Sequence, residues 1–168
     1  MKSLDKLINK IEKKIENPSK GLPEDIFRFI SRITPLINVD LLIQNKKKGT
    51  LLTWRNAGEK YAAGWHVPGG IIRIGEKIHK RLIKVAKTEL GAKIIFNKNV
   101  KEINEIHLDQ KNRKHFVSLL YKCKLKTKLR NQLDFKKNKK LVQDTWCWFK
   151  KPPKKLIKPH YIYKKYIK

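Results

Sequence analysis

Hydrophobic positions at the start of the chain follow a helical spacing. Apolar side chains recur every three or four residues through the first sixteen residues, with lysines and glutamates between them: Leu4, Leu7, Ile8, Ile11 and Ile15. This spacing predicts an amphipathic helix, which we expect to pack against the domain or a partner subunit rather than to lie on a membrane. Pro23, Glu24 and Asp25 are typical of a first helical turn and predict a second, short helix to about residue 31.

Farther along, the pattern changes to short apolar runs that are bounded by turn residues. Residues 36–44 and 50–55 are predicted to be two strands, joined by a turn at 45–49 into a hairpin. Later runs predict strands at 65–67, 93–108, 115–125 and 143–150. Residues 126–140 are predicted to be a basic loop, and the tail after Pro152 is predicted to end in a short helix around 161–167.

One helical stripe lies among these strands. Ile78, Leu82, Ala86 and Leu90 recur at helical spacing, and Gly91 suits the left-handed conformation that ends many helices. Glu89 lies off this stripe by roughly 100°, the rotation per residue of a helix. We therefore expect its carboxylate to face the edge of a cleft.

Composition limits the classes of protein. A chain of 168 residues with 40% hydrophobic content can bury the core of one domain. The formal net charge of +28 comes from lysines that are scattered along the chain, with clusters at 46–48, 122–140 and the tail. Because most of these lysines are scattered, we interpret them mainly as a compositional bias of surface positions, with non-specific binding of polyanions as the alternative. No spanning run or signal-peptide segment precedes or interrupts the domain, so we expect a cytoplasmic protein without a membrane partner.

Residues 70–92 contain the most specific pattern. Gly70, Glu76, Glu89 and Gly91 occupy four fixed positions of a motif in which a glycine turn leads, through a glutamate, into a helix that ends in Glu-x-Gly. This segment resembles the Nudix box. The box normally carries three glutamates in its helix, and the corresponding positions here read Lys84-Val85-Ala86-Lys87-Thr88-Glu89, so two of the three are absent.

A box that keeps only its last glutamate is similar to that of the GDP-mannose mannosyl hydrolases. The similarity covers residues 34–149, and it implies one Mg²⁺ held by the Gly69 carbonyl, Glu89 and a loop glutamine, here Gln143. It also implies that Asp40 and Arg55 contact a nucleotide-sugar. The family's arginine after Gly-Gly is Ile71 here, so Arg73 is expected to reach the same phosphate, and Lys84 replaces the box arginine with the same charge.

The general base differs from that of the family, since the family's loop histidine has no counterpart at Gln143 or Asp144. Asp144 and His107 are the candidate bases, although a turn residue and an ordinary strand residue are equally good interpretations. His66 is interpreted as a packed residue. Glu76 is expected to brace the glycine turn through an ion pair with Lys84.

The resemblance implies an α/β/α Nudix sandwich with a mixed sheet, preceded by a helical extension at 1–33, with the domain at 34–150 and a basic tail at 151–168. It also suggests a homodimer. Three functions remain open. The first is Mg²⁺-dependent release of nucleoside diphosphate and free sugar from a GDP-mannose-like nucleotide-sugar. The second is diphosphatase activity on another nucleoside diphosphate derivative, and the third is a catalytically weakened domain that binds nucleotide or RNA.

Overall fold

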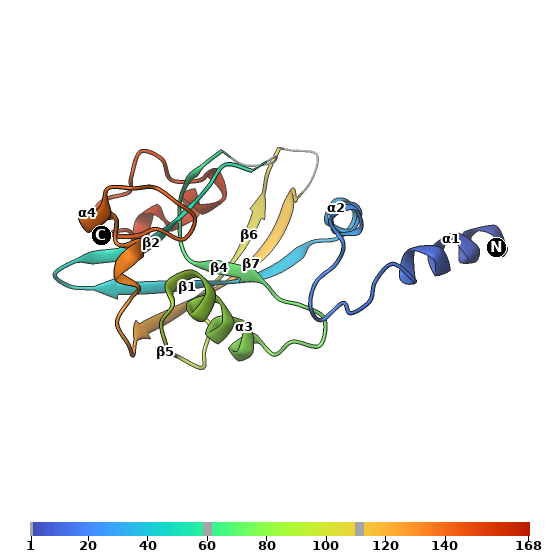
Figure 1. Cartoon of the computed structure of the whole chain (residues 1–168), viewed down its shortest axis with the longest axis horizontal. Helices are drawn as coiled ribbons and strands as arrows, with labels where there is room; N and C mark the ends of the chain where they lie inside the picture. The colour runs from blue at the N-terminus through green and yellow to red at the C-terminus, as the bar shows by residue number, and fades with distance from the viewer. Residues whose placement is uncertain (1, 59–61, 110–112) are drawn as a thin grey trace.

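The computed structural model describes residues 2–58, 62–109 and 113–168 (Figure 1). Its centre is a mixed sheet to which eight strands of the described chain contribute. The strands are β1 (Leu36–Asn45), β2 (Gly49–Arg55), β3 (Gly64–His66), β4 (Gly69–Ile71), β5 (Ile94–Phe96), β6 (Glu102–His107), β7 (His115–Leu125) and β8 (Trp146–Phe149). The hairpin, the short strand before the glycine turn and the strand 115–125 all form as predicted.

Strand β1 organises the sheet because it changes its antiparallel partner along its length. It runs parallel to β7 from Leu36 to Ile43. On its other edge, Asn38–Asp40 pair with β4, whereas Gln44 and Asn45 pair with β2. The chain between β3 and β4 crosses this division, which brings the glycine turn beside the middle of β1.

Two hydrophobic clusters pack on the sheet. Val39, Leu41 and Ile43 of β1 face the box helix, which consists of α3 (Ile78–Val85) and a π-helical turn, η1 (Ala86–Leu90). Leu42 alternates to the other face, where it packs with Tyr163 and Ile167 of the C-terminal segment. Strand alternation therefore places the helix and the C-terminal segment on opposite faces of one sheet, and the predicted α/β sandwich is confirmed.

The C-terminal residues belong to this core and do not form a separate tail. Leu156, Ile157, Tyr163 and Ile167 are all buried. Tyr163 lies on a 3₁₀ helix, η3 (Lys158–Tyr166), which replaces the short helix that was expected at 161–167, and the other three lie on either side of it. Thr50 on β2 donates to the Tyr166 carbonyl at 2.7 Å. A boundary at residue 150 thus cuts through a packed unit.

Other segments differ from the sequence prediction in detail. The region 93–108 is two strands, β5 and β6, separated by a turn that lets each pair with a different part of β7. The basic loop at 126–140 contains η2 (Asn131–Leu133) and α4 (Phe135–Asn138). Cys123 and Cys147 are buried and unpaired. Within the described residues, no helix is both long and apolar enough to cross a membrane.

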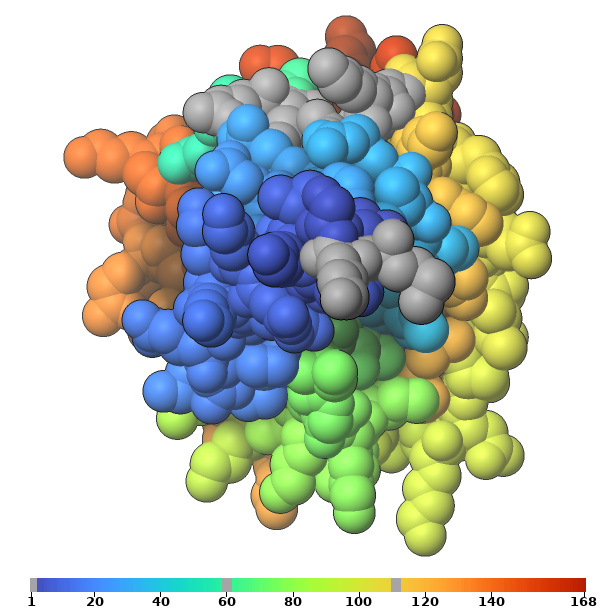
Figure 2. All heavy atoms as spheres, turned by 90° about the vertical axis from the view of Figure 1, so that its right-hand side faces the viewer, coloured from blue at the N-terminus to red at the C-terminus, as the bar shows by residue number. Residues whose placement is uncertain are grey.

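The N-terminal extension holds α1 (Lys2–Glu12) and α2 (Glu24–Ile33). Helix α1 ends four residues earlier than predicted and projects beyond α2 in Figure 1. Figure 2 views this end of the molecule, where the N-terminal residues stand foremost. The apolar residues of α1 are 41–62% exposed. The expectation that α1 packs on its own domain is therefore wrong for the described chain, and packing on a partner subunit stays a prediction.

Candidate functional site

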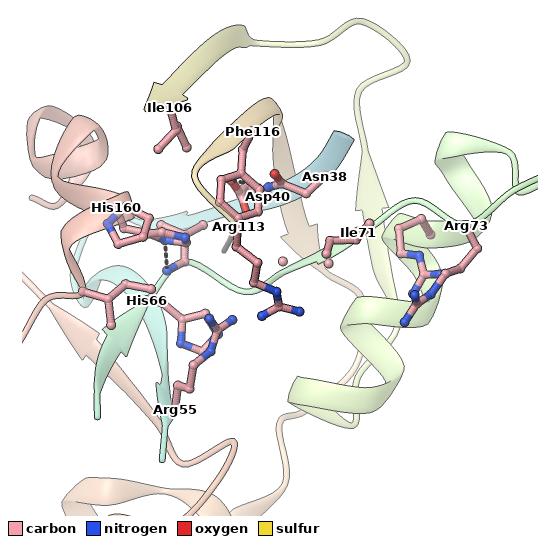
Figure 3. Close-up of a pocket in the computed structure, with 16 residues that line it drawn as sticks. Asn38, Asp40, Arg55, His66, Ile71, Arg73, Ile106, Arg113, Phe116 and His160 are labelled. Carbon is pink, nitrogen blue, oxygen red and sulfur yellow. Dashed lines mark hydrogen bonds between the residues drawn. The ribbon is translucent and has the colours of Figure 1, made fainter. Parts of the chain in front are cut away.

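A cavity of about 250 Å³ opens where β1 divides its pairing between β2 and β4 (Figure 3). Strand residues form its floor, the glycine turn and α3 form one side, and the C-terminal segment forms the other. Apolar walls come from Ile106, Phe116 and Ile157. The position of the cavity follows from the sheet, because β1 is the strand that both halves share.

Glu89 lies on the π-helical turn of the box helix, where it contacts two residues that line this cavity, His66 and Gly69. Its Oε2 accepts a hydrogen bond from the Thr53 hydroxyl at 2.9 Å, and its Oε1 accepts one from the Gly69 amide at 3.3 Å. His66 Nε2 is 3.2 Å from Oε2. The side chain of Glu89 is 15% exposed, and its place at the edge of a cleft stays a prediction. A π-helical turn inserts an extra residue into a helix and is frequent at functional sites.

The backbone of Gly69 points toward the same carboxylate. Leu41 donates to the Pro68 carbonyl at 2.8 Å, and Gly69 is the residue opposite Asp40 in this pairing. In such an antiparallel pair, the amide and carbonyl of Gly69 point away from β1. The amide is bonded to Glu89, and the carbonyl of the same residue points to the same side of the strand. The Glu89 carboxylate and the Gly69 carbonyl oxygen therefore lie on the same side of β4, the side that faces away from β1.

Asp40 lies on the opposite side of Gly69 and is almost fully buried, with 1% of its surface exposed. Its Oδ2 accepts three hydrogen bonds, from Ser118, from the Tyr163 hydroxyl at 2.7 Å and from the Asn38 amide at 3.1 Å. Oδ1 lies against the Cα of Gly69, where a Cβ atom would meet it at 2.0 Å. A side chain at position 69 would thus displace Asp40.

Burial controls the ionisation of Asp40. It raises the pKa of this carboxyl from its usual 3.8 to about 6, although the hydrogen bonds from Ser118 and Tyr163 and the charge of His66 act in the opposite direction. The negative charge of Glu89 adds to the rise. Burial likewise raises the pKa of the Tyr163 hydroxyl, with the Asp40 charge next in importance. Tyr163 is therefore a donor to Asp40 at any ordinary pH.

Four arginines line the cavity: Arg55, Arg73, Arg81 and Arg113. Figure 3 shows Arg55 and Arg113 pointing into the same space, whereas Arg73 lies beside α3. Lys84 does not line the cavity, because its position on α3 faces solvent. The basic residue of this helix that reaches the cavity is Arg81, which is buried one turn earlier.

Arg81 also replaces Lys84 as the partner of Glu76. Its Nε donates to Glu76 Oε2 at 2.6 Å, and the Arg73 amide donates to the same oxygen at 3.0 Å. Burial alone would raise the pKa of Glu76, but these two hydrogen bonds and the Arg81 charge outweigh it and lower the pKa. Glu76 therefore braces the glycine turn as expected, through a different basic residue.

Two histidines line the cavity and were not predicted to do so. His66 is 1% exposed, in agreement with a packed residue, and it contacts Glu89. His160 of η3 accepts a hydrogen bond at Nδ1 from the Val67 amide at 2.9 Å. Burial, followed by the charges of His66 and Arg55, lowers the pKa of His160 well below 6.5. This ring is neutral at physiological pH.

The candidate bases separate in the structure. His107 points away from the cavity, since Ile106 faces it and His107 is 65% exposed, beside His115. Burial raises the pKa of Asp144, against a hydrogen bond from Gln143, and the negative charge of Glu89 adds to the rise. The expectation for His107 is wrong, because adjacent strand residues face opposite sides of a sheet.

Gln143 is engaged with the protein backbone. Its Oε1 accepts the Asn56 amide at 3.1 Å, and its Nε2 donates to Asp144 at 2.8 Å. The side chain thus ties the loop before β8 to the end of β2. In this arrangement, Gln143 positions Asp144 and does not face Glu89 with a free carbonyl oxygen.

Comparison with known proteins shows the family to which this chain belongs. A model of the NUDIX domain matches residues 34–165. The chain belongs to the Nudix hydrolase family. The matched segment of this Nudix domain includes all but the last residue of η3, which also contributes to the packed core.

Individual relatives of this Nudix domain are distant. The low-salt glycan biosynthesis protein Agl8 of Haloferax volcanii is 34% identical over 79 residues, which are 47% of this chain and 49% of that protein. The alignment therefore spans about half the length of the relative. A MutT Nudix hydrolase from Burkholderia pseudomallei has a TM-score of 0.57 and 19% identity, over 80% of this chain and 99% of that one.

A second structural relative of this Nudix domain is a MutT protein from Methanosarcina mazei Go1. It has a TM-score of 0.50 and 18% identity, over 68% of this chain and 77% of that chain. At such identities, the two MutT structures show the Nudix fold and no more. The chemistry of this member of the family must be argued from its own residues.

Proposed function

We propose that this Nudix domain is a Mg²⁺-dependent hydrolase of a GDP-mannose-like nucleotide-sugar, which cleaves the glycosyl C–O bond to give nucleoside diphosphate and free sugar. One observation carries the proposal. The box helix brings a single carboxylate, Glu89, to the glycine turn, and Val85 and Thr88 stand where further carboxylates would be needed for a metal cluster. Among the described residues, no three His, Cys, Asp or Glu side chains gather as in a metal site.

The residues fit one hard cation. Mg²⁺ requires oxygen ligands and usually keeps several waters, with one or two protein carboxylates and substrate phosphates. The Glu89 carboxylate and the Gly69 carbonyl provide two oxygens on one side of β4. Gln143, the third ligand that the resemblance implies, is bonded to the Asn56 amide. The proposed protein ligands are therefore Glu89 and Gly69.

The lining of the cavity supports an anionic substrate that also carries hydroxyl groups. Guanidinium groups bind phosphate oxygens through paired donors, and we assign Arg55 and Arg73 to the diphosphate. Asp40 offers its second oxygen, Oδ1, as an acceptor. A hydroxyl group satisfies such an acceptor. A relative that is named for glycan biosynthesis is in keeping with a sugar-bearing substrate.

The reaction needs a stabilised leaving group and an activated water. A bound Mg²⁺ would neutralise charge on the departing diphosphate. Arg55 and Arg73 add positive charge at the same group. Asp144 is the base that we propose for the water, because burial and the charge of Glu89 raise its pKa and so strengthen it as a base. The water attacks the anomeric carbon opposite the leaving diphosphate, with inversion.

Product analysis tests the proposal. The purified protein is incubated with Mg²⁺ and GDP-, UDP- and ADP-sugars, and the products are resolved by chromatography. Glu89→Gln should abolish turnover because it removes the carboxylate. Lys87→Gln is the matched control, since Lys87 lies two residues earlier on the same helical turn with an exposed side chain.

The products distinguish the three functions. Nucleoside diphosphate with free sugar, lost in Glu89→Gln and kept in Lys87→Gln, is the expected result. Nucleoside monophosphate with sugar phosphate would replace the proposal by a diphosphatase. Absence of turnover over the whole panel, with nucleotide or RNA binding that persists in chelator, would replace it by a binding domain.

A further inference from the structure

The C-terminal segment brings an imidazole to the cavity at a position that the resemblance does not include. His160 lies on η3, which is fixed from below by the fully buried Tyr163. The ring of His160 meets the Tyr163 ring edge-on, with centroids 5.3 Å apart. His160 is itself only 8% exposed and lines the cavity beside Arg55 and Asp40.

The hydrogen bond at Nδ1 determines the tautomer of this ring. Nδ1 accepts the Val67 amide proton, so it cannot carry a hydrogen of its own. A neutral imidazole carries one hydrogen, which must then be on Nε2. Among the described residues, Nε2 has no hydrogen-bond partner, and it is not one of the fully buried polar atoms. Nε2–H is therefore a fixed donor, unpaired within the described chain, on a residue that lines the cavity.

Asp40 presents the complementary acceptor. Its Oδ2 is saturated by three donors, and Oδ1 takes none of them. Tyr163 connects the two groups, because its hydroxyl bonds to Asp40 and its ring packs against His160. The cavity thus offers one neutral donor and one acceptor that are held by the same tyrosine.

A hydroxyl group matches this pair, because it can donate one hydrogen bond and accept others. A phosphate oxygen can only accept, and it is served better by the arginines. We infer that His160 donates from Nε2 to a ring hydroxyl of the sugar and that this contact selects the nucleotide-sugar over the free nucleoside diphosphate. The inference rests on the proposed function, and it assigns a specificity role to the C-terminal segment.

Two substitutions at His160 distinguish the role of the Nε2 donor from that of the hydrogen bond between Nδ1 and the Val67 amide. His160→Asn places an amide oxygen near the position of Nδ1, so it can keep the bond from the Val67 amide and lose the distal donor. His160→Gln reaches farther and places an amide nitrogen near the position of Nε2, so it can restore the donor. His79→Asn is the control, since His79 is exposed on α3 and does not line the cavity.

Calorimetric titration compares GDP-mannose with GDP, UDP-glucose with UDP, and ADP-glucose with ADP. His160→Asn should weaken binding of the nucleotide-sugar about three- to tenfold, which is the usual effect of one neutral hydrogen bond. Binding of the matching diphosphate should change less than about twofold on the same scale. His160→Gln should recover part of the loss, and His79→Asn should match the wild type.

Each other outcome overturns a defined statement. Equal losses for the nucleotide-sugar and its diphosphate would place the contact on the nucleotide, and no loss would remove the contact. If the wild type releases free sugar while His160→Asn is unaffected, only the inference fails. If the wild type binds none of the nucleotide-sugars, the proposed function fails with it. Independently of any ligand, nitrogen NMR of the wild-type ring should show hydrogen on Nε2, and hydrogen on Nδ1 would refute the argument.

Discussion

Replacing Asp40 with asparagine should stabilise the folded protein at neutral pH while damaging function. Asp40 is buried, and its pKa is raised to about 6 mainly because burial disfavours the charged form. Asparagine has nearly the same shape and no charge to bury. Its oxygen can accept the hydrogen bonds that Ser118, Tyr163 and Asn38 now donate to Oδ2.

The sign and size follow from proton linkage. A carboxyl whose folded pKa lies above its unfolded value favours the folded state when it is protonated, so stability falls as the pH rises from about 3.9 to about 6. A rise of about two pKa units corresponds to roughly 3 kcal/mol. Above this pH window, the wild type carries the full free-energy penalty of burying an ionised carboxylate. Asp40→Asn avoids this penalty and should be more stable by up to about 3 kcal/mol. Near pH 4 the two proteins should be nearly equal.

Urea denaturation between pH 4 and pH 8 measures this difference. The free energy of unfolding of Asp40→Asn minus that of the wild type should increase across the window and then level off. Asp109→Asn is the control, because Asp109 is exposed and its substitution should leave the difference flat. A variant that is less stable than the wild type at pH 7 would refute the reasoning, since it would mean that the ionised carboxylate stabilises the fold.

Three further outcomes are expected. Asp144→Asn should lower kcat at least about a hundredfold with little change in KM, and an unchanged rate would exclude Asp144 as the base. Gly91→Ala should lower the free energy of unfolding, measured in urea, by about 1–3 kcal/mol. Gly91 has a φ of 61°, and a Cβ atom there would displace Arg130, which donates hydrogen bonds to the Lys87 and Thr88 carbonyls. Deleting residues 153–168 should abolish cooperative thermal unfolding, because this C-terminal segment supplies side chains to the hydrophobic core. Deleting residues 2–12, whose apolar side chains are exposed, should shift Tm by less than about 2 °C.

The sheet and the box helix could be predicted because their patterns are local. The hairpin has two apolar runs around a turn, and the helix has a stripe at i, i+4 that ends at a left-handed glycine. The packing of the C-terminal segment into the core was not predicted because lysines and prolines dominate that segment. The sequence feature that could have revealed this segment is a repeat of three residues, the period of a 3₁₀ helix, at Ile157, His160, Tyr163 and Tyr166.

Within the site, one-dimensional comparison found the positions that the motif fixes and missed those that the fold brings together. Glu89 and Gly69 meet because the motif itself folds into a turn and a helix. The prediction that Lys84 is the partner of Glu76 is wrong, and the reason is geometric. Arg81 shares its buried side of α3 with Val85, four residues later, whereas Lys84 faces solvent. Tyr163 is 123 residues from Asp40, so no local pattern could have paired them.

Because Asp40 and Tyr163 lie far apart in the sequence, the site can form only when the C-terminal segment has packed on the sheet. Asp40 receives its tyrosine donor only when η3 has packed on the sheet, and Val67 receives its imidazole acceptor in the same event. Until then, a buried carboxyl beside Gly69 would lack one of the bonds that hold it in place. The site and the second hydrophobic cluster therefore form together. A substitution that loosens the C-terminal packing should weaken substrate selection before it unfolds the sheet, because the donor at His160 lies on that segment.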